Sequence, residues 1–248
     1  MDIDELTPVQ QINNMWFKRD DLFEIAGVCG GKARTCFYLS NKSHGIVTAG
    51  SRHSPQCQIA AHISKYLSIP CRLHMPSGEY TAEMRDITEQ GGVIIQHKPG
   101  YNTVIIDRAK KDAVATGLEY VPFGMECQES IVQTGKQVAN IPDIVKRIVI
   151  PVGSGMQLAG VLHGLVNYGK KIPVLGVVVG ADPIKRLNKY APIFWQQMVE
   201  LVTVTIDYSV HIKDNIINNI ELDPVYEAKC LPYLTDGDLL WIVGKRSK

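Results

Sequence analysis

The sequence predicts an α/β fold in which helices cover parallel β-sheets. Short apolar runs typical of buried strands alternate with stretches of helical periodicity: residues 45–49 precede a helix-like stretch at 56–67. The same alternation returns in the second half of the chain, where the apolar run 147–152 precedes a helix-like stretch at 156–168. Strands that alternate with helices indicate βαβ units, because a parallel partner strand needs a long crossover connection.

The remaining elements continue this pattern. We predict further strands at residues 69–75, 93–96, 120–123, 173–179 and 239–243, and further helices at 80–90, 102–116 and 130–139. After Asp182 the pattern weakens, and Pro183 and Pro192 mark loops. We expect two domains that pack together with a ligand between them. Residues 1–40 and 125–248 form the larger domain, and residues 41–124 form a smaller βαβ domain.

Composition and charge exclude several classes of protein. The chain has 248 residues, of which 45% are hydrophobic and 21% are charged, as in ordinary globular proteins. A net charge of +1 gives no electrostatic reason to expect nucleic acid or an anionic membrane as a partner. The six cysteines form no C-x-x-C pair and no metal-ligand spacing with His, which indicates reduced thiols and no metal site. The acidic N-terminus lacks an apolar signal segment, and the longest apolar run, residues 148–166, carries polar residues, so we expect a cytoplasmic protein.

A lysine that follows two glycines is the first candidate functional residue. Gly30 and Gly31 allow a tight turn, and Lys32 then opens a predicted helix. The positive end of the helix dipole and the neighbouring Arg34 both disfavour a charged ammonium. A neutral lysine amine can attack an aldehyde, so Lys32 is a candidate imine-forming residue. The alternative is a solvated lysine at a helix start.

A glycine-rich turn between a predicted strand and helix is the second candidate. Gly153, Ser154, Gly155 and Met156 lie where a helix begins, and their backbone N–H groups and the Ser154 hydroxyl suit a phosphate. A dinucleotide fingerprint is the rival interpretation, but four residues rather than two separate Gly155 from Gly160. Glycines that only allow tight packing remain a further alternative.

An imine-forming lysine together with a phosphate cradle suggests pyridoxal 5'-phosphate, whose aldehyde and phosphate need these two groups. At this point the sequence resembles the tryptophan-synthase-β-like (fold type II) pyridoxal-phosphate enzymes, nearest the branch of 1-aminocyclopropane-1-carboxylate (ACC) deaminase and D-cysteine desulfhydrase. The resemblance runs from about residue 17 to residue 243. It rests on four ordered segments, residues 18–21 with 30–34, 50–56 with 60–61, 153–160, and 222–229.

The resemblance implies a two-domain fold with the cofactor in the cleft between the domains, and a homodimer. It assigns catalytic roles to Lys32, Ser54 and Tyr226, with Lys32 as the Schiff-base lysine and the base for the substrate α-proton. It places Glu227 opposite the pyridine nitrogen, where a carboxylate keeps that nitrogen protonated. The cofactor-binding residues that it implies are Lys32, Gly153, Ser154, Gly155, Met156 and Glu227, and the substrate-binding residues are Ser51, Arg52, His53, Ser54 and Gln56.

Two departures from the family pattern bear on the reaction. Pro55 stands where the family usually has Asn, so this loop lacks an amide side chain and a backbone N–H. Residues 202–221 are expected to be too few to carry the second pocket tyrosine that the deaminases use.

The function predicted first is a pyridoxal-phosphate-dependent lyase, which removes the α-proton of an amino acid and then eliminates or deaminates. One alternative is a decarboxylase or lyase whose amino-acid substrate is attached to a larger carrier, such as a modified nucleotide. A binding protein without turnover is another alternative. No role is assigned to Gly244, Lys245 and Arg246.

Overall fold

The computed structural model describes residues 2–245. Met1 and residues 246–248, which the predicted larger domain includes, lie outside the described residues. Contacts divide the chain into two compact units: unit 1 contains the residues up to Phe23 and Gln128–Lys245, and unit 2 contains Glu24–Cys127. The predicted division differs from these units because it groups residues 24–40 with the larger domain, and it stays a prediction.

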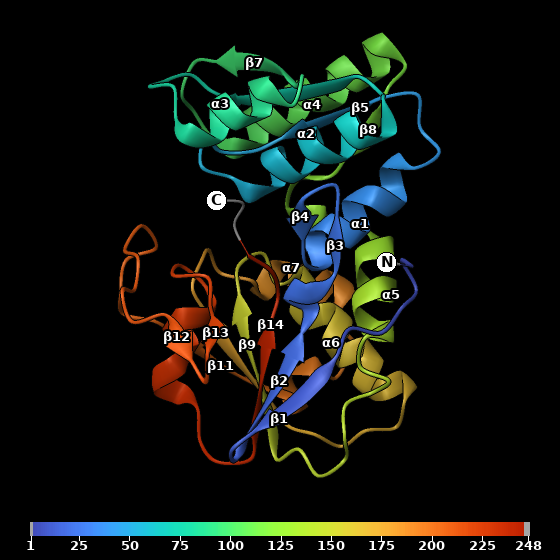
Figure 1. Ribbon diagram of the computed structural model, residues 1–248. Helices are drawn as coiled ribbons and strands as arrows, with labels where there is room; N and C mark the ends of the chain where they lie inside the picture. Colours follow the sequence, from blue (N-terminus) through green and yellow to red (C-terminus); the bar gives the residue numbers. More distant parts are fainter. Residues whose placement is uncertain (1, 246–248) are drawn as a thin grey trace. The chain divides into compact units, whose positions relative to one another are not determined.

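Unit 1 is built on a six-stranded sheet with the order β1-β2-β14-β9-β10-β11 (Figure 1). β1 and β2 form an antiparallel hairpin, and every other pair is parallel. The strands are β1 (Val9–Ile12), β2 (Met15–Arg19), β9 (Arg147–Val152), β10 (Val174–Val178), β11 (Val199–Thr203) and β14 (Asp238–Ile242). The helices are α5 (Gln128–Lys136), α6 (Met156–Asn167) and α7 (Ile184–Tyr190), with short 3-10 helices η1 (Asp20–Leu22), η3 (Trp195–Gln197) and η4 (Glu227–Tyr233).

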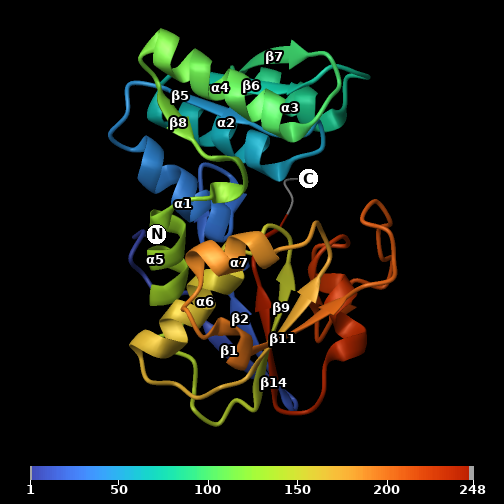
Figure 2. The ribbon, with the colours of Figure 1, turned by 180° about the vertical axis from the view of Figure 1, so that it is seen from behind.

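The core of unit 1 lies on both faces of this sheet, because side chains alternate along each strand. Ile148 and Ile150 of β9 face the cluster that includes helix residues such as Leu162, whereas Val149 faces a second cluster that includes Ala228 of η4. Helices α5 and α6 pack especially closely: a Cβ on Gly164 would lie 2.5 Å from the carbonyl oxygen of Gly135. Figure 2 shows α6 and α7 on the helical side of the sheet; the small hairpin β12 (Ile216–Ile217) and β13 (Ile220–Glu221) belongs to the other side.

Unit 2 contains a four-stranded parallel sheet with the order β7-β6-β5-β8. Its strands are β5 (Ile46–Ala49), β6 (Cys71–Pro76), β7 (Val93–His97) and β8 (Glu119–Val121), and its helices are α1 (Gly31–Ser40), α2 (Pro55–Leu67), α3 (Ala82–Glu89) and α4 (Asn102–Thr116). A small hairpin, β3 (Glu24–Ile25) with β4 (Val28–Cys29), precedes α1, and η2 (Phe123–Met125) follows β8. One face of β5 packs on the apolar stripe of α4 formed by Ile105, Ala109 and Ala113.

The predicted α/β architecture with parallel strands is confirmed. Every predicted strand and helix is present with bounds within a few residues, and α4 spans the predicted residues 102–116. The prediction missed α7 and β11, which follow Asp182, and the hairpin of β1 and β2. All six cysteines are present as thiols and not as disulfides. Within residues 2–245, no helix is long and apolar enough to cross a membrane, and no group of three or more metal-ligating side chains could hold an ion.

Candidate cofactor site

The glycine turn of unit 1 connects the carboxyl end of β9 to the first turn of α6. Gly155, the N-cap of α6, has φ +89°, a conformation that L residues with a side chain rarely adopt. A Cβ at Gly155 would lie 3.0 Å from Cβ of Pro183, and one at Gly153 would lie 3.0 Å from Cε1 of Tyr226. Because the first N–H groups of a helix have no partner within it, this bare turn presents donors to an anion such as a phosphate.

The carboxylate of Glu227 supplies a second group that suits the cofactor. Glu227 is fully buried in η4, and its Oε1 accepts a hydrogen bond from the backbone N–H of Val243 at 2.8 Å. Its Oε2 is buried and has no hydrogen-bond partner among the described residues. Burial raises the pKa of Glu227 well above its usual range, and the nearby carboxylates of Asp223 and Asp21 raise it further. A buried oxygen without a partner is costly, and a ring N–H would satisfy it, so the site fits a protonated pyridine.

A turn built by Asp223 fixes the direction of Tyr226 and Glu227. Oδ1 of Asp223 accepts hydrogen bonds from the N–H groups of Val225 at 2.8 Å and Tyr226 at 2.9 Å. The carbonyl of Asp223 accepts a further bond from the N–H of Ala228 at 3.0 Å. Aspartate caps a chain turn in this way because its short side chain reaches the backbone two and three residues ahead. The local sequence therefore sets how η4 begins.

Tyr226 contacts a second tyrosine that the sequence interpretation did not expect. The hydroxyl groups of Tyr208 and Tyr226 lie 2.9 Å apart, and the two rings meet edge to face with centroids 5.8 Å apart. Residues 202–221 therefore bring a tyrosine to this motif, while the expectation that they are too few to carry the pocket tyrosine of the deaminases stays a prediction. The connection from β11 to β12 makes a compact turn in which Oδ1 of Asp207 accepts a bond from the Ser209 N–H, and this turn brings Tyr208 back toward η4. An Asp followed two residues later by Ser was the available sequence signal.

Gln157 is another polar residue that sequence reasoning did not single out. It is the second residue of α6, and its Nε2 is buried without a hydrogen-bond partner among the described residues. A buried amide donor in the first turn of this helix suits the same anion as the glycine turn. Ser154 and Met156, both predicted, lie in that turn, half-buried and buried respectively.

Lys32 lies in unit 2 as the second residue of α1, where it is half-buried. The N-cap before it is Gly30, with φ +89° and ψ −179°, a pairing that favours glycine. Arg34, one position beyond Ala33, is buried. The sequence therefore places this lysine at the positive end of a helix, as its glycines indicate.

The loop after β5 carries the predicted substrate-binding residues. Ser51 and His53 are exposed, and Arg52 and Ser54 are half-buried. Nη1 of Arg52 donates to the carbonyl of Glu79 at 2.9 Å, and Nδ1 of His53 lies 3.6 Å from the Glu83 carboxylate. These two side chains therefore already have partners inside unit 2.

Ser54 and Gln56 differ in how much of their hydrogen-bonding capacity unit 2 uses. Ser54 is the N-cap of α2, but its hydroxyl makes no capping bond. Nε2 of Gln56 donates to Oγ1 of Thr48 at 3.0 Å and to the carbonyl of Pro122 at 2.9 Å, and its Oε1 accepts the Gly124 N–H at 2.7 Å. The amide of Gln56 thus ties α2 to β5 and to the chain after β8.

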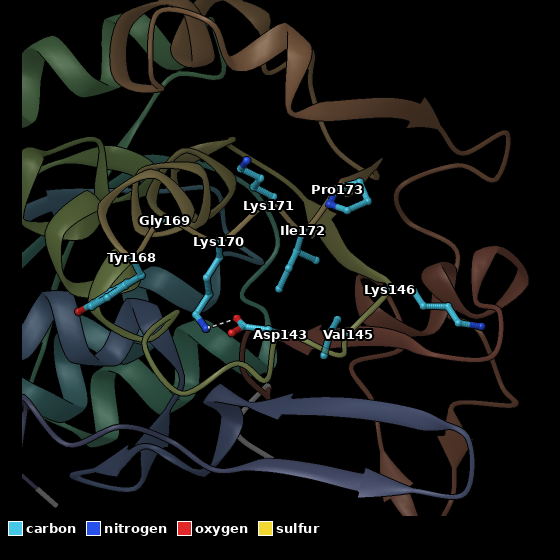
Figure 3. Close-up of a pocket in the computed structure, with 9 residues that line it drawn as sticks. All are labelled: Asp143, Val145, Lys146, Tyr168, Gly169, Lys170, Lys171, Ile172 and Pro173. Atoms are coloured by element: carbon cyan, nitrogen blue, oxygen red, sulfur yellow. Dashed lines mark hydrogen bonds and ion pairs between the residues drawn. The ribbon is translucent and has the colours of Figure 1, made fainter.

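A cavity of about 330 Å³ lies elsewhere in unit 1, at the amino ends of β9 and β10. Figure 3 shows its lining, in which Lys170 forms an ion pair of 2.8 Å with Asp143, while the ammonium groups of Lys146 and Lys171 point away from each other. In parallel sheets, ligands bind beyond the carboxyl ends of the strands, which is where the glycine turn lies. The glycine turn, and not this cavity, therefore lies where ligands of parallel sheets bind.

A glycine turn at the carboxyl end of a parallel strand, a buried carboxylate with one free oxygen and a Gly-Gly-Lys helix start define an α/β protein that binds pyridoxal phosphate. The family described as "Pyridoxal-phosphate dependent enzyme" matches residues 3–223, and the chain belongs to this family. Its cofactor is pyridoxal 5'-phosphate. The predicted fold type II is confirmed.

Solved structures with this fold share little sequence with the chain. An ACC deaminase homologue has a TM-score of 0.80 and 20% identity, and the match covers 97% of this chain and 89% of that one. Threonine deaminase isoform 2 from Solanum lycopersicum has a TM-score of 0.68 and 17% identity, with 98% and 79% of the two chains covered. Maize serine racemase has a TM-score of 0.67 and 15% identity, with 98% and 88% covered. At these identities the likeness shows the fold alone.

A curated relative comes from Salmonella phage ViI and is named "O-seryl-dTMP PLP-dependent decarboxylase". It is 25% identical to the chain over 205 residues, which is 66% of this chain and 47% of the relative. The chain thus spans about half the length of the curated relative that it matches.

Proposed function

We propose that the chain is a pyridoxal-phosphate-dependent lyase that acts on an α-amino acid group, with elimination or deamination as the first reaction to test. The observation that carries the proposal is the buried Oε2 of Glu227, which lacks a partner in the described chain. Pyridoxal phosphate, when bound, withdraws electrons from the substrate Cα. A carboxylate that keeps the ring nitrogen protonated strengthens this withdrawal, so Glu227 favours chemistry in which Cα becomes carbanionic.

In this proposal, Lys32 holds the cofactor aldehyde and then moves the α-proton on its Nζ. The N-terminal position of Lys32 in α1 puts its amine at the positive end of the helix dipole, which favours the neutral form that this role needs. The glycine turn and Gln157 hold the phosphate.

The proposed role of each substrate-contacting side chain depends on the hydrogen-bond partners that it already has. Ser54, whose hydroxyl is not used to cap α2, is proposed to bind the substrate carboxylate or to assist proton transfer. The hydroxyl of Tyr226 is proposed to donate a hydrogen bond to the leaving group, with Tyr208 as the hydrogen-bond partner of Tyr226. Ser51, Arg52 and His53 complete the proposed substrate loop. Gln56 is proposed to support this loop through the hydrogen bonds of its amide with neighbouring segments of unit 2.

A second candidate reaction is decarboxylation of an amino acid that is carried on a nucleotide. Two observations favour it: the activity in the name of the phage relative, and Pro55, which removes a backbone donor from the start of α2. A weaker hold on the substrate carboxylate suits a reaction in which that group leaves, because catalysis must stabilise the transition state, in which the carboxylate is departing, more than the bound substrate. A homodimer and a cytoplasmic location remain predictions.

The first test is an absorbance spectrum of the purified protein with pyridoxal phosphate, before and after borohydride reduction, beside Lys32→Ala. We expect a band at roughly 410–430 nm, as for protonated imines of this cofactor, that borohydride traps on Lys32. The absence of a band in the wild type, or trapping in the variant, would refute the role of Lys32.

The second test incubates the holoenzyme with free amino acids and with O-seryl-dTMP, and measures ammonia, keto acid and carbon dioxide. Ammonia with keto acid supports elimination or deamination, and carbon dioxide from O-seryl-dTMP supports the second candidate. A protein that binds the cofactor but releases none of the three from these substrates would favour the binding protein without turnover.

A further inference from the structure

A buried lysine beside the tyrosine pair has no part in the proposed reaction. Lys229 lies in η4, and its side chain is among the largest fully buried ones. Burial lowers the pKa of Lys229, against the opposing effect of the Asp207 and Asp223 carboxylates. Placing an ammonium in the interior costs free energy unless hydrogen bonds compensate, so its partners indicate what it does.

Those partners are two backbone carbonyls of the segment that carries Tyr208. Nζ of Lys229 donates to the carbonyl of Asp207 at 2.8 Å and to that of Tyr208 at 3.2 Å. The ammonium also lies 5.9 Å from the centroid of the Tyr208 ring, on its face. Lys229 therefore holds both the backbone and the ring of this residue.

The segment from Val204 to Ile212 is tied to the rest of unit 1 at its two ends and at its middle. The ends are fixed because the Val204 N–H donates to the Val178 carbonyl at 3.1 Å and the Ile212 N–H donates to the Pro224 carbonyl at 2.9 Å. Between these ends, the bonds of Asp207 with Ser209 and Val210 are local. The middle of the segment is thus held to η4 by the two carbonyl bonds of Lys229 and by the hydroxyl bond of Tyr208.

We propose that Lys229 is a positioning residue that sets the substrate pocket through Tyr208. A continuous series of contacts connects it to the cofactor turn: Lys229 holds Tyr208, the Tyr208 hydroxyl meets the Tyr226 hydroxyl, and the Tyr226 ring lies against Gly153. Without the ammonium, the Tyr208 carbonyl loses its donor and the Asp207 carbonyl keeps only its local bond with the Val210 N–H, so nothing but the Tyr208 hydroxyl holds the middle of the segment to η4 and the segment moves away. Tyr226 then loses its contact with Tyr208. The inference rests on the proposed function for its effect on substrate, but its effect on the segment does not.

The test compares Lys229→Met, which keeps the length of the side chain without its charge, with Lys229→Arg, which keeps the charge. Lys213→Met is the control, because Lys213 lies in the same connection with an exposed side chain. Amide hydrogen exchange of residues 205–211 is measured in the holo forms. We expect exchange about tenfold faster in Lys229→Met, a smaller change in Lys229→Arg and no change in Lys213→Met. Unchanged exchange in Lys229→Met would overturn the proposal; if that variant does not fold, Lys229→Gln, which is shorter and uncharged, takes its place, and unchanged exchange there would overturn the proposal.

A double-mutant cycle with Tyr208→Phe tests whether Lys229 acts through the tyrosine. We expect Lys229→Met to raise KM about tenfold and to change kcat less, and to have less than about twofold effect in the Tyr208→Phe background. Additive effects would show that Lys229 acts by another route and would overturn this part of the proposal. If the wild type turns over none of the substrates, the proposed function fails, while the hydrogen-exchange result still decides the role of Lys229.

Discussion

The candidate site residues of unit 1 and those of unit 2 differ in how far their polar groups already have partners. In unit 1, Glu227 Oε2 and Gln157 Nε2 are buried without hydrogen-bond partners in the described chain. In the loop of unit 2, Arg52 and His53 already contact Glu79 and Glu83. Unit 1 is therefore prepared for a ligand of fixed shape, whereas the unit 2 loop is supported by its own neighbours. A cofactor held permanently and a substrate that exchanges would produce this difference.

The largest expected effect concerns Glu227. Glu227→Gln should still bind the cofactor, but turnover should fall about a hundredfold, because a neutral amide stabilises a protonated ring nitrogen poorly. Absorbance titration and steady-state rates measure the two quantities. Unchanged turnover would remove Glu227 from the mechanism, and the unpartnered oxygen of Glu227 would then no longer distinguish unit 1 from the loop of unit 2.

The same variant makes a separate prediction for the protein without cofactor. The pKa of Glu227 is raised in the folded state, so the folded protein binds its proton more tightly than the unfolded chain does. Stability from this group is complete below the unfolded pKa and is lost as the pH rises toward the folded pKa. Glu227→Gln apoprotein should therefore match the wild type near pH 4 and exceed it in stability at neutral pH, as urea melts at both pH values would show.

The next effect tests the glycine turn. Gly155→Ala should weaken cofactor binding about tenfold or more, since a left-handed residue with a side chain costs about 1–2 kcal/mol and its Cβ would crowd Pro183. Gly169→Ala is the matched control: Gly169 has φ +64°, and a Cβ added there would meet no atom within 4 Å, so this substitution introduces the backbone strain alone. Equal cofactor affinity in both variants would mean that the turn does not hold the phosphate.

The site could be predicted from the sequence where backbone and short-range chemistry determine it. Gly155 and the Asp223 turn fix their geometry within a few residues, so a local pattern indicates it. Tyr208 could not be placed in this way, because its contact with Tyr226 depends on how the connection after β11 folds back. The fold followed the same rule: long periodic elements such as α4 were predicted, while the seven-residue α7 was missed because a short helix between prolines shows little periodicity.

A smaller effect separates Ser54 from its neighbours in the unit 2 loop. Ser54→Ala should lower kcat/KM about tenfold, the worth of one hydrogen bond to a charged group, and leave cofactor affinity unchanged. His53→Gln should change kcat/KM less than about twofold, because His53 is exposed and its contact is with Glu83. A large effect of His53→Gln would show that the loop residues bind substrate despite their internal partners.

The smallest expected effect lies in a polar network of unit 2 that contains no ligand group. Nδ1 of His97 faces Nη1 of Arg108 at 2.9 Å, its Nε2 faces Nδ1 of His74 at 2.8 Å, and Nε2 of His74 faces Asp112 at 3.0 Å. Because Arg108 can only donate, every contact is satisfied when both imidazoles are neutral with the proton on Nε2. Arg72, which forms two hydrogen bonds with Asp112, completes the network and holds the pKa of Asp112 to about 2.

Burial lowers the pKa of His97, and its protonated form would also be repelled by Arg108 and by a protonated His74, against the opposing effect of Asp112. The unfolded chain therefore binds the proton more readily, and stability should fall as the pH drops below about 6.5. His97→Gln, whose amide can accept from Arg108 but cannot titrate, should reduce the loss of stability between pH 7 and pH 5, as urea melts would measure. An acid response identical to that of the wild type would show that protonation of His97 does not destabilise the folded protein, and that the network accommodates an imidazolium despite its contacts.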